Sequence, residues 1–246
     1  FWDKVDGEFK VMDANLSTVN YLAPDGTSWM LTKASFHFAG DFYLGPNLDK
    51  VILEGVNALS ISSDGNVTLS KSLTGSLSPS SPHLPAGSLL DGHDAYYGDD
   101  PSKGHRIGRG VLGGFGGAQG PGKGHSLGSN SAGGLSGGGA SHGGEGGPAA
   151  SGPAGIVYGS ADLSILMGGS GGGVGNLGEA AAGGGALEII SAGKLSVESG
   201  VNVSMNGGSV LVNPNQGAYF SGGAGSGGSI RLVARSILNK GNLSVR

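Results

Sequence analysis

The sequence contains no cysteine. Disulfides, thiolate metal sites and cysteine nucleophiles are therefore all excluded. No stretch approaches the roughly 18 to 20 apolar residues that a membrane-spanning segment needs. The first residues, Phe-Trp-Asp-Lys, carry neither an initiator methionine nor a signal peptide. We therefore expect the chain to be a processed or partial piece of a longer protein.

Charged and aromatic residues are also scarce. The 14 Lys and Arg residues against 18 Asp and Glu residues give a formal net charge of −4, with no Lys/Arg cluster. Because nucleic-acid binding requires a basic patch, nucleic acid is not an expected partner. The hydrophobic fraction of 37% is below the usual share for a globular core. A thick, multilayered core is therefore not expected.

Glycine, in contrast, fills 54 of the 246 positions. It is sparse up to about residue 90 and dense over residues 108–185. Beyond that point it forms short clusters between apolar, β-branched runs such as residues 186–190 and 229–234. This distribution is typical of β-strands joined by glycine turns.

An internal repeat is visible in the sequence. Residues 59–69 can be laid over residues 195–205 without a gap at an offset of 136, and residues 237–245 match residues 197–205 at an offset of 40. The unit has a glycine cluster, a strand, a turn and a second strand with Asn-x-Ser/Thr. Its period-two alternation puts one face of each strand inward. Since one strand pair cannot bury its apolar face, such units must stack. The repeat predicts an all-β fold, a parallel β-solenoid (β-helix-like).

Three regions follow from the composition. Residues 1–90 are expected to form an aromatic-rich β cap or the first solenoid rungs, with a separate small β domain as the alternative. Residues 91–185 would contain an acidic turn and a glycine-rich insertion, either packed polyglycine or polyproline-II-type helices or an irregular insertion laid on the solenoid. Residues 186–246 would form rungs that are incomplete at the C-terminal end.

The glycine motifs carry a resemblance. They occur in this order: Gly-Gly-Gly-Ala-Ser-His-Gly-Gly-Glu-Gly-Gly (137–147), Val-Tyr-Gly-Ser (157–160), Gly-Gly-Ser-Gly-Gly-Gly (168–173), Gly-Gly-Gly-Ala-Leu-Glu-Ile-Ile (183–190) and the run 222–232. This order resembles the glycine-rich, parallel β-helix-like extracellular and surface proteins of plants, protists and bacteria. It covers roughly residues 108–246. The resemblance implies a repetitive secreted scaffold and supplies no catalytic motif.

Four Asn-x-Ser/Thr sequons are candidate N-glycosylation sites, at Asn15, Asn66, Asn202 and Asn242. Three of them occupy the same repeat position, which would present the asparagine identically on successive rungs. The competing interpretation is an asparagine ladder, in which stacked amides bond along the solenoid.

Other side chains give weaker signals. Asp91, Asp94, Asp99 and Asp100 place four carboxylates within ten residues, a weak candidate Ca²⁺ site that a solvated loop explains better. Catalysis would need carboxylates at a set separation, and the candidates are all local in sequence. We therefore expect no enzyme activity and no cofactor.

The sequence thus favours a structural module of an extracellular or cell-surface filament or coat. It would assemble through strand edges with copies of itself or with further segments of its own long chain. The alternatives are a carbohydrate-binding adhesin, with the aromatic region from Trp29 to Tyr43 as its site, and less favourably a polysaccharide-cleaving enzyme.

Overall fold

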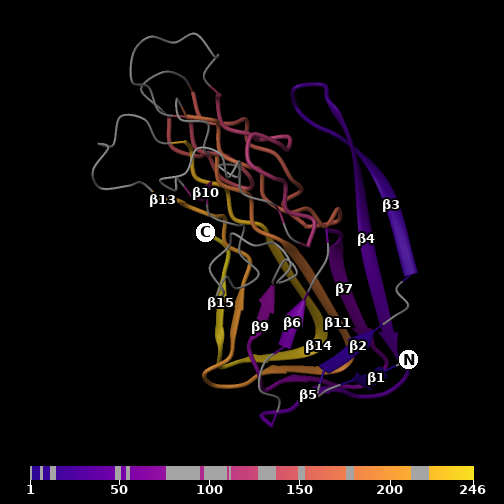
Figure 1. The fold of residues 1–246 in the computed structure, drawn as a ribbon. Coiled ribbons are helices and arrows are strands. Elements are labelled where there is room, and N and C mark those ends of the chain that lie inside the picture. The colour runs from indigo at the N-terminus through magenta and orange to yellow at the C-terminus, as the bar shows by residue number, and fades with distance from the viewer. Residues whose placement is uncertain are drawn as a thin grey trace.

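The structure is a computed structural model (Figure 1). It describes residues 2–5, 8–11, 15–47, 51–53, 56–75, 95–96, 110, 112–126, 137–148, 153–175, 180–211 and 222–246. These residues form strands and connecting segments, and none of them is helical.

The strands in the described residues are mostly short, and three of them have 11 or 12 residues. They are β1 (Trp2–Val5), β2 (Glu8–Val11), β3 (Asn15–Leu22), β4 (Ser28–Phe38), β5 (Phe42–Leu44), β6 (Val51–Leu53), β7 (Ala58–Ser63), β8 (Val67–Leu69), β9 (Leu73–Gly75), β10 (Ala95–Tyr96), β11 (Ala186–Val197), β12 (Asn202–Ser204), β13 (Val210–Leu211), β14 (Ser229–Asn239) and β15 (Asn242–Ser244).

Two sheets make up most of the body. The larger has seven strands, with the path β3-β4-β7-β11-β8-β5 and β14 paired to β11; the smaller has the order β15-β12-β9-β6. Strands β1 and β2 pair with each other, as do β10 and β13. The result is a mixed sheet curled into a half-barrel, with the long β3–β4 hairpin along one side (Figure 1).

The expectation of an all-β fold agrees with this structure, but the expected parallel β-solenoid is wrong. Strand β3 runs antiparallel to β4, and β1 antiparallel to β2, so the chain reverses where a solenoid would continue in one direction. The reversal after β3 is made by Pro24-Asp25-Gly26. The Asp25 carboxylate accepts hydrogen bonds from Thr27 N and Oγ1, and Gly26 has φ +83°, which glycine adopts without strain.

The pairing predicted from the repeat is confirmed in part. Asn202 pairs with Asn242 and Ser204 with Ser244, which is the expected offset of 40. Residues 59–69, however, do not pair with residues 195–205 at the expected offset of 136. Leu59 pairs with Leu187, and β8 pairs with the second half of β11, where Val67 lies opposite Leu195. The backbone pairing therefore follows an offset of 128.

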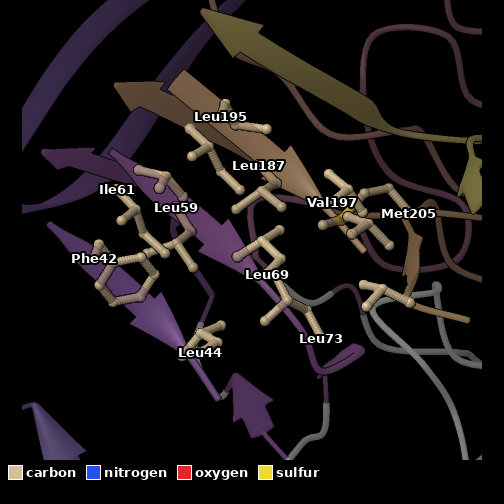
Figure 2. Close-up of a cluster of buried hydrophobic side chains, with 14 of the residues drawn as sticks. Phe42, Leu44, Leu59, Ile61, Leu69, Leu73, Leu187, Leu195, Val197 and Met205 are labelled. Atoms are coloured by element: carbon tan, nitrogen blue, oxygen red, sulfur yellow. The ribbon is translucent and has the colours of Figure 1, made fainter. Parts of the chain in front are cut away.

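The core lies on the inner face of the curled sheet. Leu187 and Ile189 of β11 are fully buried, and so are Leu69 and Leu195 (Figure 2). The remaining members of the cluster are Phe42, Leu44, Leu59, Ile61, Val67, Leu73, Leu112, Val197, Val201, Val203 and Met205. Because aliphatic side chains from β7, β8, β11 and β12 meet here, segments more than 100 residues apart share one core.

Serines at equivalent positions in two of the layers, Ser63 and Ser191, bond to the backbone of the neighbouring layer. Ser63 Oγ donates to Gly40 O (2.6 Å) and accepts from Gly65 N (3.1 Å). One layer further on, Ser191 Oγ donates to Gly65 O (2.8 Å) and accepts from the amide two residues later (3.2 Å). In β14 the residue opposite Ser191 is Ala234, which has no hydroxyl.

The described parts of the glycine-rich region bond to one another through their backbones. Gly169 N donates to Gly184 O (2.8 Å), Gly184 N to Ser226 O (2.9 Å) and Gly172 N to Ala181 O (2.9 Å). The described residues contain no α-, 3₁₀- or π-helix. Polyproline-II-type glycine helices have no internal hydrogen bonds by which such an assignment could find them, so they stay a prediction. The segments approach so closely that a Cβ on many of the glycines would meet a neighbouring carbonyl oxygen at 1.7–2.5 Å.

Candidate functional site

The four sequon asparagines lie in different environments. Asn66 connects three layers: its backbone N–H and its Nδ2 donate to Asp41 Oδ1 (2.7 and 3.3 Å), and its Oδ1 accepts from Lys194 N (2.9 Å). The Asn66 amide therefore has a structural role in joining the β5, β8 and β11 layers.

Asn202 and Asn242 are exposed and lie directly opposite each other on β12 and β15. Asn15 is exposed at the start of β3. Asn66 precedes β8, which pairs with β11, and so does not share the row of Asn202 and Asn242. The predicted presentation of three equivalent asparagines on successive rungs is thus reduced to one pair, because Asn66, although exposed, lies in another row.

The acidic candidate site cannot be placed. Asp91, Asp94, Asp99 and Asp100 lie outside the described residues. Within the described ranges, no three His, Asp or Glu side chains gather as a metal site would require. The weak Ca²⁺ candidate therefore stays a prediction.

Aromatic side chains of the β3–β4 hairpin pack against the glycine-rich segments. Trp29 meets Phe115 edge to face, with ring centroids 5.1 Å apart, and Tyr21 lies 6.4 Å from Tyr158. Gly159 N donates to the Tyr21 hydroxyl (3.1 Å). These rings connect the hairpin to the insertion and are not a free stacking platform for a sugar.

Of the aromatic side chains proposed as a carbohydrate site, Tyr43 is the most exposed, at 60%. Phe42 belongs to the buried core, and Phe36 and Phe38 pack against it. A single exposed ring provides little of the concave, aromatic lining that sugar sites use. The adhesin alternative gains no support from this region.

A histidine is enclosed in the glycine-rich region. His142 Nδ1 lies 3.0 Å from Gly227 O, and its ring lies 4.7 Å from that of Tyr158. Burial lowers the pKa of His142 below its usual value, so the imidazole is mostly neutral at pH 7. Burial also raises the pKa of Tyr158, whose hydroxyl donates to Gly168 O (2.7 Å). Both rings act as buried packing and hydrogen-bonding groups.

Ser62, His37 and Asp64 form a surface cluster that the sequence did not suggest. His37 Nδ1 lies 3.0 Å from Ser62 Oγ, and Nε2 lies 3.3 Å from Asp64 Oδ2. The order is that of a nucleophile, a base and an orienting acid. The His37 and Asp64 side chains are 56% and 62% exposed, however, and nothing there excludes water. The cluster is best explained as a cross-strand polar contact.

A buried carboxylate lies on the outer face of the larger sheet. The Glu188 side chain is 3% exposed, and its oxygens accept hydrogen bonds from Ser60 Oγ (2.6 Å), Arg231 (2.6 Å) and Lys33 Nζ (3.3 Å). Burial opposes ionisation, but the hydrogen bonds from Ser60 and Arg231 and the charge of Lys33 outweigh it. They hold the pKa of Glu188 below its ordinary value. Glu188 therefore cross-links β4, β7, β11 and β14.

Glu188→Gln is expected to lower the free energy of unfolding by about 2 kcal/mol at pH 7, a moderate value because Lys33 and Arg231 can rehydrate. Since the folded pKa lies below the unfolded one, this stabilisation is present above the unfolded pKa and is lost as pH falls through the folded pKa. Urea unfolding between about pH 7 and pH 3 should show a shallower loss in the variant than in the wild type. The exposed Glu145→Gln is the control. Parallel pH profiles for Glu188→Gln and wild type would contradict this role.

The two ends of the larger sheet are its most distinctive surface features. On the described part of the chain, no strand pairs with the outer edge of β14 or of β3. On β14, Ile237 lies opposite the buried Leu195 yet is 49% exposed. On β15, Leu243 lies opposite the buried Val203 and is 36% exposed. The apolar inner face is therefore uncovered at this end.

No family model, curated protein or solved structure matches the chain. Among the described residues there is no helix long and apolar enough to cross a membrane.

Two of these features have signals in the sequence itself. The β3–β4 hairpin was signalled by Pro-Asp-Gly between two alternating runs. Glu188 occupies an outward position within the apolar run 186–190, which marks a charge that needs partners. Its partners Lys33 and Arg231 are far away in sequence, and no local pattern identifies them.

Proposed function

We propose that the chain is a structural module of an extracellular scaffold, a filament or a coat, whose units join through the edges of their sheets. The observation that carries the proposal is the uncovered end of the half-barrel. Ile237, Leu243 and Val245 are 49%, 36% and 50% exposed, although the residues opposite the first two are buried. Unpaired strand edges beside uncovered apolar side chains are what a sheet that continues into a partner presents.

The second support is the way in which the layers are held together. Serine and asparagine side chains bond to the backbone of the adjacent layer, and the glycine-rich segments bond laterally through amides and carbonyls. Such connections rely on neither disulfides nor cofactors. They suit a module whose task is to keep its shape.

The extracellular location rests on the sequons. Asn66, Asn202 and Asn242 are all exposed, but the Asn66 amide is engaged in hydrogen bonds with Asp41 and Lys194 N. In material from the native source we expect a glycan on Asn202 or Asn242 and none on Asn66. Attachment at Nδ2 of Asn66 would displace its contact with Asp41.

Peptide mass spectrometry of the native protein, with and without a glycan-releasing amidase, shows which of the four asparagines carry a glycan. Asn15 is exposed, lies outside the Asn202–Asn242 row and serves as the internal comparison. Unmodified asparagines at all four positions would remove the support for an extracellular location. A glycan found on Asn66 alone would contradict the structural role given to its amide.

A further inference from the structure

Two long strands lie at edges of the larger sheet and pair with no further strand of the described residues, and the three-residue β5 forms a third edge. Strand β14 has 11 residues and β3 has 8. They terminate the same sheet, since β3 pairs with β4 and β14 with β11, and between β4 and β14 every strand runs parallel. Because β3 is antiparallel to β4, a β14 strand placed beside β3 so as to continue the sheet would pair with it in the antiparallel sense. Antiparallel pairing is slightly the more stable of the two.

Within the described residues, β3 lacks the protection that natural sheets use against edge-to-edge pairing, and on β14 the exposed charge is that of Arg235. Strand β3, Asn-Leu-Ser-Thr-Val-Asn-Tyr-Leu, contains no charged residue and no proline. On it Leu16, Val19 and Leu22 are 64%, 44% and 70% exposed. On β14, Ile237 and Leu238 are 49% and 37% exposed, and Arg231 is engaged by Glu188. Lysine, proline or a covering loop normally blocks such edges.

The two ends of the chain carry opposite charge. From residue 199 to Arg246 there is no Asp or Glu but four cations, and Arg235, Lys240 and Arg246 are exposed. Residues 1–57 contain eight Asp or Glu and four Lys. Beside β3, the exposed Asp25 is kept ionised because hydrogen bonds from Thr27 lower its pKa. Pairing of β14 with a second β14 would bring cations together, whereas β3 carries no charge of its own and has the acidic Asp25 in the turn that follows it.

We propose that β14 of one copy pairs with β3 of a second copy, so that the larger sheet continues from molecule to molecule. The inference rests on the proposed structural function and names the partner of its edge. A contact between two different surfaces of the same chain is heterologous, and when it does not close into a ring it produces an open filament.

Two blocked variants test this pairing. Leu16→Lys with Val19→Lys places a charge on both faces of β3, and Ile237→Lys with Leu238→Lys does the same on β14. Ile156→Lys with Val157→Lys is the matched control, since these adjacent residues are 50% and 44% exposed and lie on neither strand. All six side chains are at least a third exposed, so the fold is expected to survive, as circular dichroism and thermal unfolding can verify.

Sedimentation velocity over a range of concentrations gives the readout. Wild type and control should form species larger than a dimer, and each blocked variant alone should stay monomeric. An equimolar mixture of the two blocked variants should form a dimer and nothing larger, because each retains the edge that the other lacks.

Other outcomes distinguish the specific β14–β3 pairing from the more general proposal that the units assemble through their sheet edges. If the β3 variant dimerises alone and mixing adds nothing, β14 pairs with β14 and this inference is wrong, while assembly through edges stands. If wild type assembles and both blocked variants still do so, other surfaces are used and the β14–β3 pairing is wrong. If wild type stays monomeric at all concentrations, both this inference and the proposed assembly through edges fail.

Discussion

Gly184→Ala is expected to destabilise the protein by about 3 kcal/mol, because the glycine-rich region has no space for a methyl group there. A Cβ at Gly184 would lie 1.9 Å from Met205 O and 2.6 Å from Asn206 O. Both are backbone atoms, which cannot rotate away as a flexible side chain can. Met205 O also accepts a hydrogen bond from Gly228 N (2.7 Å), so displacing this carbonyl disturbs a second segment.

The matched control is Gly143→Ala. A Cβ at Gly143 would meet nothing within 4 Å, and its φ lies outside the left-handed region. Alanine also reduces the conformational entropy of the unfolded chain, so this variant should be unchanged or more stable by up to about 1 kcal/mol. Equal loss of stability in both variants would show that glycine is required for flexibility during folding and not for close approach.

Urea unfolding measures the difference between Gly184→Ala and its control, and hydrogen exchange locates it. Gly169 N donates to Gly184 O, and Gly184 N donates to Ser226 O. The amide of Gly169 should therefore lose protection in Gly184→Ala but not in Gly143→Ala. Exchange at Gly169 that is unchanged despite a loss of stability would mean that the strain relaxes elsewhere.

The sequence predicted the strands better than their arrangement. Period-two alternation located β7, β11 and β14, because the alternating apolar and polar residues within a strand determine which of its faces packs inward. The alignment of Asn202 with Asn242 was also correct, since only one short unit separates them. Local pattern and short separation were sufficient in these cases.

The pairing partner of β7 and β8 could not be predicted in the same way. The sequence alignment matched residue 67 to residue 203, an offset of 136, whereas in the structure Val67 pairs with Leu195, an offset of 128. Leu, Ile and Val alternate in all of these strands, so several registers bury the same number of apolar side chains. Side-chain to backbone bonds, such as those of Asn66 to Lys194 N and of Ser191 to Gly65 O, favour the register that is seen. Their partners lie more than 120 residues away, beyond any local pattern.

In the candidate site, too, the features that follow from local pattern were predictable and those that depend on distant residues were not. The exposure of Asn202 and Asn242 follows from the outward positions of their strands, as the alternation indicates. The engagement of Asn66 and the burial of Glu188 depend on residues from three layers, so composition alone could not identify them.

Leu187→Ala is expected to lower the free energy of unfolding by about 3 to 4 kcal/mol, a large part of the stability of a typical domain. Leu187 is fully buried near the start of β11, where it pairs with Leu59 of β7 (Figure 2) and with Ile230 of β14. Truncation leaves a cavity that the rigid neighbouring strands can fill only in part. Because β11 joins the early and late parts of the chain, the loss should appear as a single cooperative transition.

Urea unfolding of three variants tests the role of Leu187. Leu187→Met keeps the side-chain volume and should cost less than about 1.5 kcal/mol, so it provides a folded comparison if the alanine variant does not fold. Leu22→Ala, at a leucine that is 70% exposed, should change stability by no more than about 0.5 kcal/mol. Two separate transitions in Leu187→Ala would show that the segments on either side of β11 have independent cores. A loss as small as that of Leu22→Ala would place Leu187 outside the core altogether.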